Sequence, residues 1–295
     1  MADLSSRCST PQFASAATEA AFNAAYDAVL GKWPVSVESV KVPSAYGTTH
    51  VQVTGPQEGK PLVLLHGGGA TSTVWFANVG ALSRTHRVYA VDQMGDAGRS
   101  VHDGQPIKRP ADLMSWLDAL LDGLGLDGAA LVGHSYGGWL ALSYALHAPA
   151  RVRKLVLLDP TYCFTGMTLG FRVRALPLFI RPSAQRTRNF LTWEAAGTTL
   201  DTDWLVLASL AGGEVRRSKL ILPRRPRDSD LLRAAMPTLI LTAEKSRQHD
   251  IGRLAANAER LMSNVFTAVV PGASHFTMPM HAPEHLNREL TQFLV

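Results

Sequence analysis

One serine lies in a setting that could make it a nucleophile. The pentapeptide Gly133-His-Ser135-Tyr-Gly137 reads Gly-x-Ser-x-Gly, with an apolar run before it and a helix-like run after it. A strand that turns sharply into a helix holds the middle residue in a strained conformation and exposes its side chain above the sheet edge. The small residues two before and two after let strand and helix approach. Ser135 is therefore predicted to be a nucleophile.

A histidine near the C-terminus is the predicted base. His275 follows a short β-type run and a Pro-Gly pair, so it should lie on the loop after the last strand. From such a loop an imidazole can reach the nucleophile and take its proton.

Two backbone N–H groups are predicted to bind a developing oxyanion. A buried-looking strand ends in His66 and three glycines, and glycine backbone can approach a ligand closely. Gly68 is the expected donor there, and Tyr136 supplies the second N–H at the start of the helix. A phosphate-binding loop is disfavoured because the Gly-x-x-x-x-Gly-Lys-Ser/Thr spacing is absent.

These motifs together resemble the α/β-hydrolase fold superfamily, serine carboxylesterase type. The resemblance rests on His66-Gly-Gly-Gly, Asp92-Gln-Met-Gly-Asp-Ala-Gly-Arg-Ser, Gly133-His-Ser-Tyr-Gly and Gly272-Ala-Ser-His. Within the superfamily the chain is most similar to bacterial carboxylesterases of the naproxen-esterase kind. The resemblance implies an α/β fold with a mostly parallel central sheet flanked by helices, and a helical cap inserted after strand six.

The third member of the triad departs from the family pattern. The seventh strand should be followed by Gly-x-x-Asp, but Ser246 occupies the expected acid position. Asp250, four residues later on the same loop, is the predicted acid, and related esterases are expected to carry one there. Glu244 near the strand end and Asp159 at the end of the sixth strand remain alternatives, although an Asp before Pro commonly caps a turn.

The expected reaction is hydrolysis of a small to medium carboxylic ester through an acyl-enzyme, with Ser135, His275 and Asp250 as the triad. No cofactor and no metal are expected: His281 and His285 have helical spacing, but Pro283 lies between them and no third ligand is evident. A lactonase, an amidase, a C–C bond hydrolase or a ligand-sensing signalling protein of the same fold are the alternatives.

The chain divides into a core and an insertion. Strand-like and helix-like runs alternate up to Asp159 and resume at residue 236, which predicts a parallel sheet covered on both faces. The predicted core is 1–159 plus 236–295, and the predicted helical cap is 160–235, with helices near 168–175 and 203–210. No long apolar lid helix is expected. The predicted substrate-binding residues are Trp75, Phe164, Met167 and Trp204, with Phe171, Phe179 and Trp193 as further lining residues.

Composition sets the remaining expectations. The 295 residues carry a formal charge of +5, 46% hydrophobic residues and two distant cysteines, Cys8 and Cys163. No signal peptide and no membrane-spanning run are recognised, so a cytoplasmic location is expected. The basic stretch 216–227 is interpreted as a solvated loop, since no nucleic-acid motif accompanies it. The expected partner is a small-molecule ester, with no nucleic acid and no membrane, and a monomer or homodimer is expected.

Overall fold

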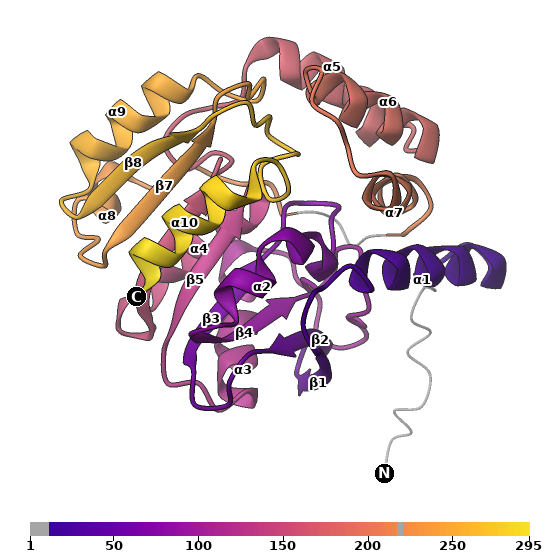
Figure 1. The fold of residues 1–295 in the computed structure, drawn as a ribbon, viewed down its shortest axis with the longest axis horizontal. Coiled ribbons are helices and arrows are strands. Elements are labelled where there is room, and N and C mark those ends of the chain that lie inside the picture. The colour runs from indigo at the N-terminus through magenta and orange to yellow at the C-terminus, as the bar shows by residue number, and fades with distance from the viewer. Residues whose placement is uncertain (1–11, 217–220) are drawn as a thin grey trace.

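The computed structural model describes residues 12–216 and 221–295, which form an eight-stranded sheet in the order β1-β2-β4-β3-β5-β6-β7-β8 (Figure 1). β1 and β2 are paired antiparallel, β2 is antiparallel to β4, and all the other pairs are parallel. The strands are β1 (Glu38–Ser44), β2 (Gly47–Thr54), β3 (Lys60–Leu65), β4 (His86–Val91), β5 (Ala129–His134), β6 (Val152–Leu158), β7 (Thr238–Ala243) and β8 (Val265–Val270). The predicted mostly parallel sheet is confirmed.

Helices cover both faces of this sheet. They are α1 (Ala16–Leu30), α2 (Val79–Leu82), α3 (Pro110–Gly123), α4 (Tyr136–His147), α5 (Leu169–Ile180), α6 (Ala184–Glu194), α7 (Thr202–Gly213), α8 (Asp228–Leu231), α9 (Ile251–Leu261) and α10 (Pro283–Leu294), with short 3-10 helices at Ser72–Ala77 and Pro149–Arg151. The apolar side chains of α3, α4 and α9 share one buried cluster, and those of α1, α2, α7 and α10 share another.

Successive side chains of a strand belong alternately to these two clusters. In β3, Val63 and Leu65 belong to the first cluster, whereas Leu62 and Leu64 belong to the second. Successive side chains of a strand point to opposite faces, so a strand buried on both sides is apolar throughout. This is the physical reason why the parallel strands were recognisable as short apolar runs.

Four helices, α5 to α8, lie between β6 and β7, and α5, α6 and α7 lie together at one end of the molecule (Figure 1). α7 lies close to the predicted position, but α5 continues past the expected end at residue 175 as far as Ile180, with Pro177 inside it. Proline removes one donor to the residue four positions earlier. That residue is Val173, which as a whole is 61% exposed. The division into core and cap by residue number stays a prediction.

The loop after β4 is built around a buried carboxylate. Asp92 is completely buried and accepts hydrogen bonds from the N–H groups of Ser72 (2.7 Å) and Arg99 (2.8 Å) and from the hydroxyl of Tyr26 (3.0 Å). Gly98 has a φ of +141°, and a methyl group on it would lie 2.6 Å from the carboxyl carbon of Asp92. Only glycine fits there, and the loop joins α1, β4 and the segment after β3.

We predict that Gly98→Ala lowers the free energy of unfolding by about 2 kcal/mol or more, through backbone strain and the clash with Asp92. Gly125→Ala is the matched control, because Gly125 also has a positive φ but would place its methyl group in open space. The control should lose only about 1 kcal/mol. Urea denaturation of both variants measures this; equal losses would show that Asp92 does not confine the loop.

Candidate active site

Ser135 lies at the sharp turn between β5 and α4. Its φ of +54° and ψ of −114° are unusual for a residue with a side chain. A methyl group on Gly133 would lie 2.2 Å from the Gly137 carbonyl oxygen, and one on Gly137 would lie 2.2 Å from that of Leu65. Both glycines are therefore required by close backbone approach, as the pentapeptide predicts.

His275 connects Ser135 to a buried carboxylate, which is that of Asp159. The Nε2 atom of His275 lies 2.8 Å from the Ser135 oxygen, and its Nδ1 atom lies 2.6 Å from Asp159 Oδ2. A carboxylate only accepts, so Nδ1 carries the proton and Nε2 accepts from the serine hydroxyl. All three side chains are at least nine-tenths buried.

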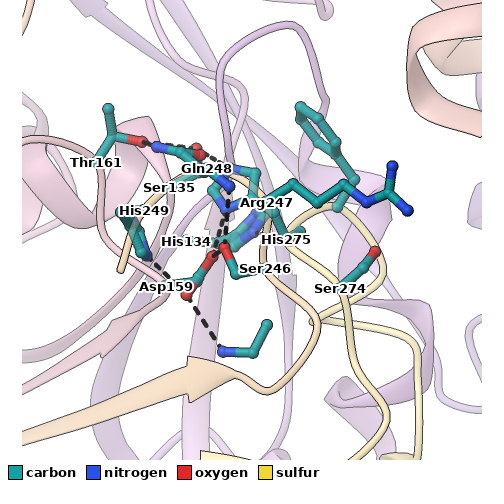
Figure 2. Close-up of polar contacts among 12 residues, drawn as sticks. His134, Ser135, Asp159, Thr161, Ser246, Arg247, Gln248, His249, Ser274 and His275 are labelled. Carbon is teal, nitrogen blue, oxygen red and sulfur yellow. Dashed lines mark hydrogen bonds and ion pairs between the residues drawn. The ribbon is translucent and has the colours of Figure 1, made fainter. Parts of the chain in front are cut away.

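Asp159 is held from four sides (Figure 2). Oδ1 accepts from His249 Nε2 (2.9 Å) and the Ala243 N–H (3.2 Å), and Oδ2 accepts from Ser246 Oγ (2.7 Å) as well as from His275. Burial by itself raises the pKa of a carboxyl group, but the two histidines outweigh it and hold the pKa of Asp159 well below its usual value. The group is therefore ionised at neutral pH.

The expectation that Asp250 reaches His275 is wrong in this structure. Asp250 is exposed and forms the N-cap of α9, where its side chain accepts from the Arg253 N–H at 2.9 Å. Glu244 is also elsewhere, accepting from the Gly272 N–H at 2.7 Å. The loop after β7 turns into a helix at Asp250, and a cap must point at that helix rather than back toward the sheet.

Two residues that the sequence analysis did not assign to the site donate hydrogen bonds to the Asp159 carboxylate. Ser246 occupies the usual acid position and donates a hydrogen bond to the carboxylate supplied by β6, and His249 donates the second side-chain bond. Asp159 has a φ of +43°, so its backbone is turned at the strand end. The missing acid at position 246 was the sequence signal that another strand supplies it.

A second polar chain reaches Ser135 from the opposite side. Gln248 donates its amide to the Thr161 hydroxyl oxygen, which lies 3.1 Å from the Ser135 hydroxyl oxygen. Because the Ser135 proton is directed at His275, the Thr161 proton is left to donate to Ser135. Thr161 therefore restrains the serine rotamer, and no pattern in the sequence pointed to it.

The backbone around His275 is fixed by Glu194, the last residue of α6. Its fully buried carboxyl accepts from the N–H groups of His275 (3.0 Å) and Phe276 (3.1 Å) and from the Ser274 hydroxyl (2.9 Å). Burial raises its pKa, although His275 and these donors act in the opposite direction. A helix between β6 and β7 thus anchors the loop that carries the histidine.

His134, next to the serine, fixes the same loop. Its Nε2 donates to the His275 carbonyl oxygen at 2.8 Å, and burial, with the nearby His275, lowers the pKa of His134 to about 3. His134 therefore stays neutral and acts as a hydrogen-bond donor rather than as a base.

The predicted oxyanion donors lie beside each other. A methyl group on Gly68 would lie 3.5 Å from Tyr136 Cβ, and one on Gly67 would lie 3.3 Å from Ser135 Cβ. Tyr136 begins α4, and the leading N–H groups of a helix have no partner within it. The glycine loop is tied down by Asp96, which accepts from the Gly69 N–H at 2.9 Å.

The predicted substrate-binding residues are scattered. Trp75 and Trp204 are buried in the apolar cluster that includes α1 and α7, whereas Phe164 is buried in the cluster on the other face of the sheet. Met167 packs against a small cluster formed by α5 and α6. The α5 side chain that lies against the site is Phe171, whose ring is 6.1 Å from that of His275. Substrate binding by the four predicted residues remains a prediction.

Comparison with known proteins agrees with this geometry. Residues 62–288 match the model of the Alpha/beta hydrolase family, which is more than half of the chain. This chain belongs to the alpha/beta hydrolase family. The resemblance found in the sequence motifs and the α/β fold are both confirmed.

Two Bacillus subtilis proteins illustrate the relatives of this alpha/beta hydrolase. Carboxylesterase YbfK is 28% identical over 291 residues, covering 96% of each chain, and the uncharacterized carboxylesterase nap is 28% identical over 91% of this chain and 90% of its own. The crystal structure of naproxen esterase from the same organism superposes with a TM-score of 0.86 at 26% identity, covering 94% of this chain and 98% of that one.

Membrane spans, metal sites and the basic stretch can each be checked in the described part of this alpha/beta hydrolase. No helix within residues 12–216 and 221–295 is long and apolar enough to cross a membrane. Over the same residues, no group of three His, Cys, Asp or Glu side chains could hold a metal ion. In the basic stretch, Arg225 and Arg227 pair with Asp228 and Asp230, while Arg217, Lys219 and the distant Cys8 lie outside the described residues.

Proposed function

We propose that this chain is a carboxylic ester hydrolase in which Ser135 is the nucleophile, His275 the base and Asp159 the acid. The observation that carries the proposal is the continuous hydrogen-bonded series from the Ser135 hydroxyl through His275 to Asp159. The carboxylesterases among the relatives support an ester as the substrate class.

In the first half of the reaction, the Ser135 oxygen attacks the ester carbonyl carbon while His275 Nε2 takes the serine proton. Asp159 stabilises the resulting imidazolium, because its carboxylate is already ionised and desolvated. The N–H groups of Gly68 and Tyr136 bind the oxyanion of the tetrahedral intermediate. Collapse of the intermediate expels the alcohol, which receives the proton from His275, and leaves an acyl-serine.

In the second half, a water molecule replaces the alcohol. His275 takes one proton from the water as its oxygen attacks the acyl carbon, and the same two N–H groups bind the new oxyanion. Ser135 leaves with the proton returned by His275, and the carboxylic acid is released. Thr161 restrains the serine side chain before attack, and Glu194 holds the histidine backbone.

The substrate proposed is a small to medium, mainly apolar ester. Ser135 is 7% exposed, and Phe171 of α5 lies against the ring of His275, so the nucleophile lies in buried, partly aromatic surroundings. Such surroundings bind a short acyl or alcohol group by burying its apolar surface. The cytoplasmic location and the monomeric or homodimeric state remain predictions.

Ser135→Ala should abolish turnover of p-nitrophenyl acetate while the protein remains folded, because no other group takes the place of the attacking oxygen. A serine-reactive fluorophosphonate should label Ser135 in the parent, as located by peptide mass spectrometry. Labelling of another residue, with undiminished turnover in the alanine variant, would contradict the assignment. One labelling event per parent molecule without ester turnover would indicate a ligand-sensing protein instead.

Asp159→Asn should reduce turnover by about four orders of magnitude, because an amide can donate to Nδ1 and favours the wrong histidine tautomer. Asp250→Asn is the matched control and should keep turnover within about twofold, because asparagine caps a helix as well as aspartate does. Initial rates of p-nitrophenyl acetate hydrolysis measure both. A large loss in the Asp250 variant, with Asp159→Asn active, would restore Asp250 as the acid.

Esters with short acyl chains should be hydrolysed faster than those with long ones, because Ser135 is buried and Phe171 lies against His275. A series of p-nitrophenyl esters from acetate to palmitate, each below its solubility limit, gives kcat/KM for the comparison. Fastest hydrolysis of the palmitate ester would contradict the proposed preference for short acyl chains.

A further inference from the structure

The outer face of α5 is apolar and exposed. Leu169, Val173, Leu176 and Ile180 recur at positions i, i+4, i+7 and i+11, so they share one face of the helix. Together with Phe179 they are between 53% and 72% exposed. We call these five side chains the outer stripe. Exposed hydrophobic residues scattered singly over a surface need no explanation, but a group that gathers on one helix does.

Packing inside the molecule does not account for the outer stripe. The inner face of α5 is formed by Phe171, Ala175 and Leu178, which pack against Phe190 and Trp193 of α6. Phe171 also lies against His275. Since the inner face already supplies the contacts that hold the helix, the apolar outer face is available to something outside the described part of the chain.

The segment of the chain that carries the outer stripe is basic. Between Asp159 and Glu194 the sequence has no Asp or Glu, and it has five arginines: Arg172, Arg174, Arg181, Arg186 and Arg188. Arg174 lies over the ring of Trp193, with its guanidinium carbon 5.2 Å from the ring centroid, and Arg247 lies over the same ring at 4.9 Å. No acidic residue of the same segment offsets these five charges.

These charges decide between two occupants of the face. A second copy docking through the same helix would bring two copies of this basic segment together, and like charges at an interface are unfavourable. An anionic lipid surface would receive both features, because an interfacial helix inserts its apolar side chains and its arginines pair with the headgroups. Figure 1 shows α5 at the outer edge of the molecule, where a flat surface can reach it.

We propose that the outer stripe of α5 and its flanking arginines form a docking face for an anionic membrane surface. Docking is peripheral and reversible, so it agrees with the lack of a membrane-spanning helix in the described residues. It revises the expectation from the sequence that the chain has no membrane partner. Since the inner face of α5 contacts His275, docking places the proposed active site at the surface, which goes beyond ester hydrolysis itself.

Vesicle flotation tests the proposal with the full chain. The parent should float with vesicles of equal parts phosphatidylglycerol and phosphatidylcholine about tenfold more than with phosphatidylcholine alone, and less as salt increases. Val173→Ser/Ile180→Ser and Arg172→Gln/Arg181→Gln should each reduce flotation by about tenfold. The control Leu232→Ser/Arg153→Gln changes an exposed leucine and an exposed arginine elsewhere and should float as the parent does.

Each other outcome counts against the proposal. Equal flotation with both kinds of vesicle, or none with either, would overturn it. So would a parent dimer in sedimentation equilibrium that Val173→Ser/Ile180→Ser converts to a monomer, since a second copy would then cover the face. Hydrolysis of soluble p-nitrophenyl acetate serves only as the test of folding and should be unchanged in all variants. Loss of flotation with normal hydrolysis separates this proposal from the proposed function.

Discussion

The buried carboxylate of Asp159 is the interaction on which the site depends. An ionised carboxylate without solvent is costly, and here the cost is offset by four donors from three parts of the chain: the end of β7, the loop that follows it, and the His275 loop. The hydrogen bonds to the Asp159 carboxylate also fix the positions of these donors. The buried charge therefore holds these loops together. The low pKa of Asp159 keeps its carboxylate ionised, so the histidine has a negatively charged partner.

A second buried carboxyl group, that of Glu194, connects the segment between β6 and β7 to the site. Glu194 at the end of α6 binds two consecutive backbone N–H groups of the histidine loop, and Phe171 of α5 covers the imidazole. The loop has one preferred position because its polar backbone is satisfied by a side chain from a distant element. The helices above the sheet are thus supports of the histidine as well as walls of the space around it.

α5 brings together two environments that are usually separate. Its inner face packs on aromatic side chains next to the histidine, while its outer face presents exposed apolar residues. A helix apolar on both faces is expected only where both faces meet something apolar. The proposed lipid surface supplies the second contact, and it places the ester-hydrolysing site where amphiphilic molecules gather.

The sequence by itself determined the features that are local. The Gly-x-Ser-x-Gly turn, the glycine loop at Gly68 and the short apolar strands each depend on neighbouring residues, whose spacing is visible in the chain. The acid was decided by tertiary structure, because Asp159 and Asp250 both follow β-strands and only the parallel register of β6 and β7 brings one of them to His275. Thr161, Glu194 and the exposure of the outer stripe depend in the same way on which distant elements meet, and no local pattern records that.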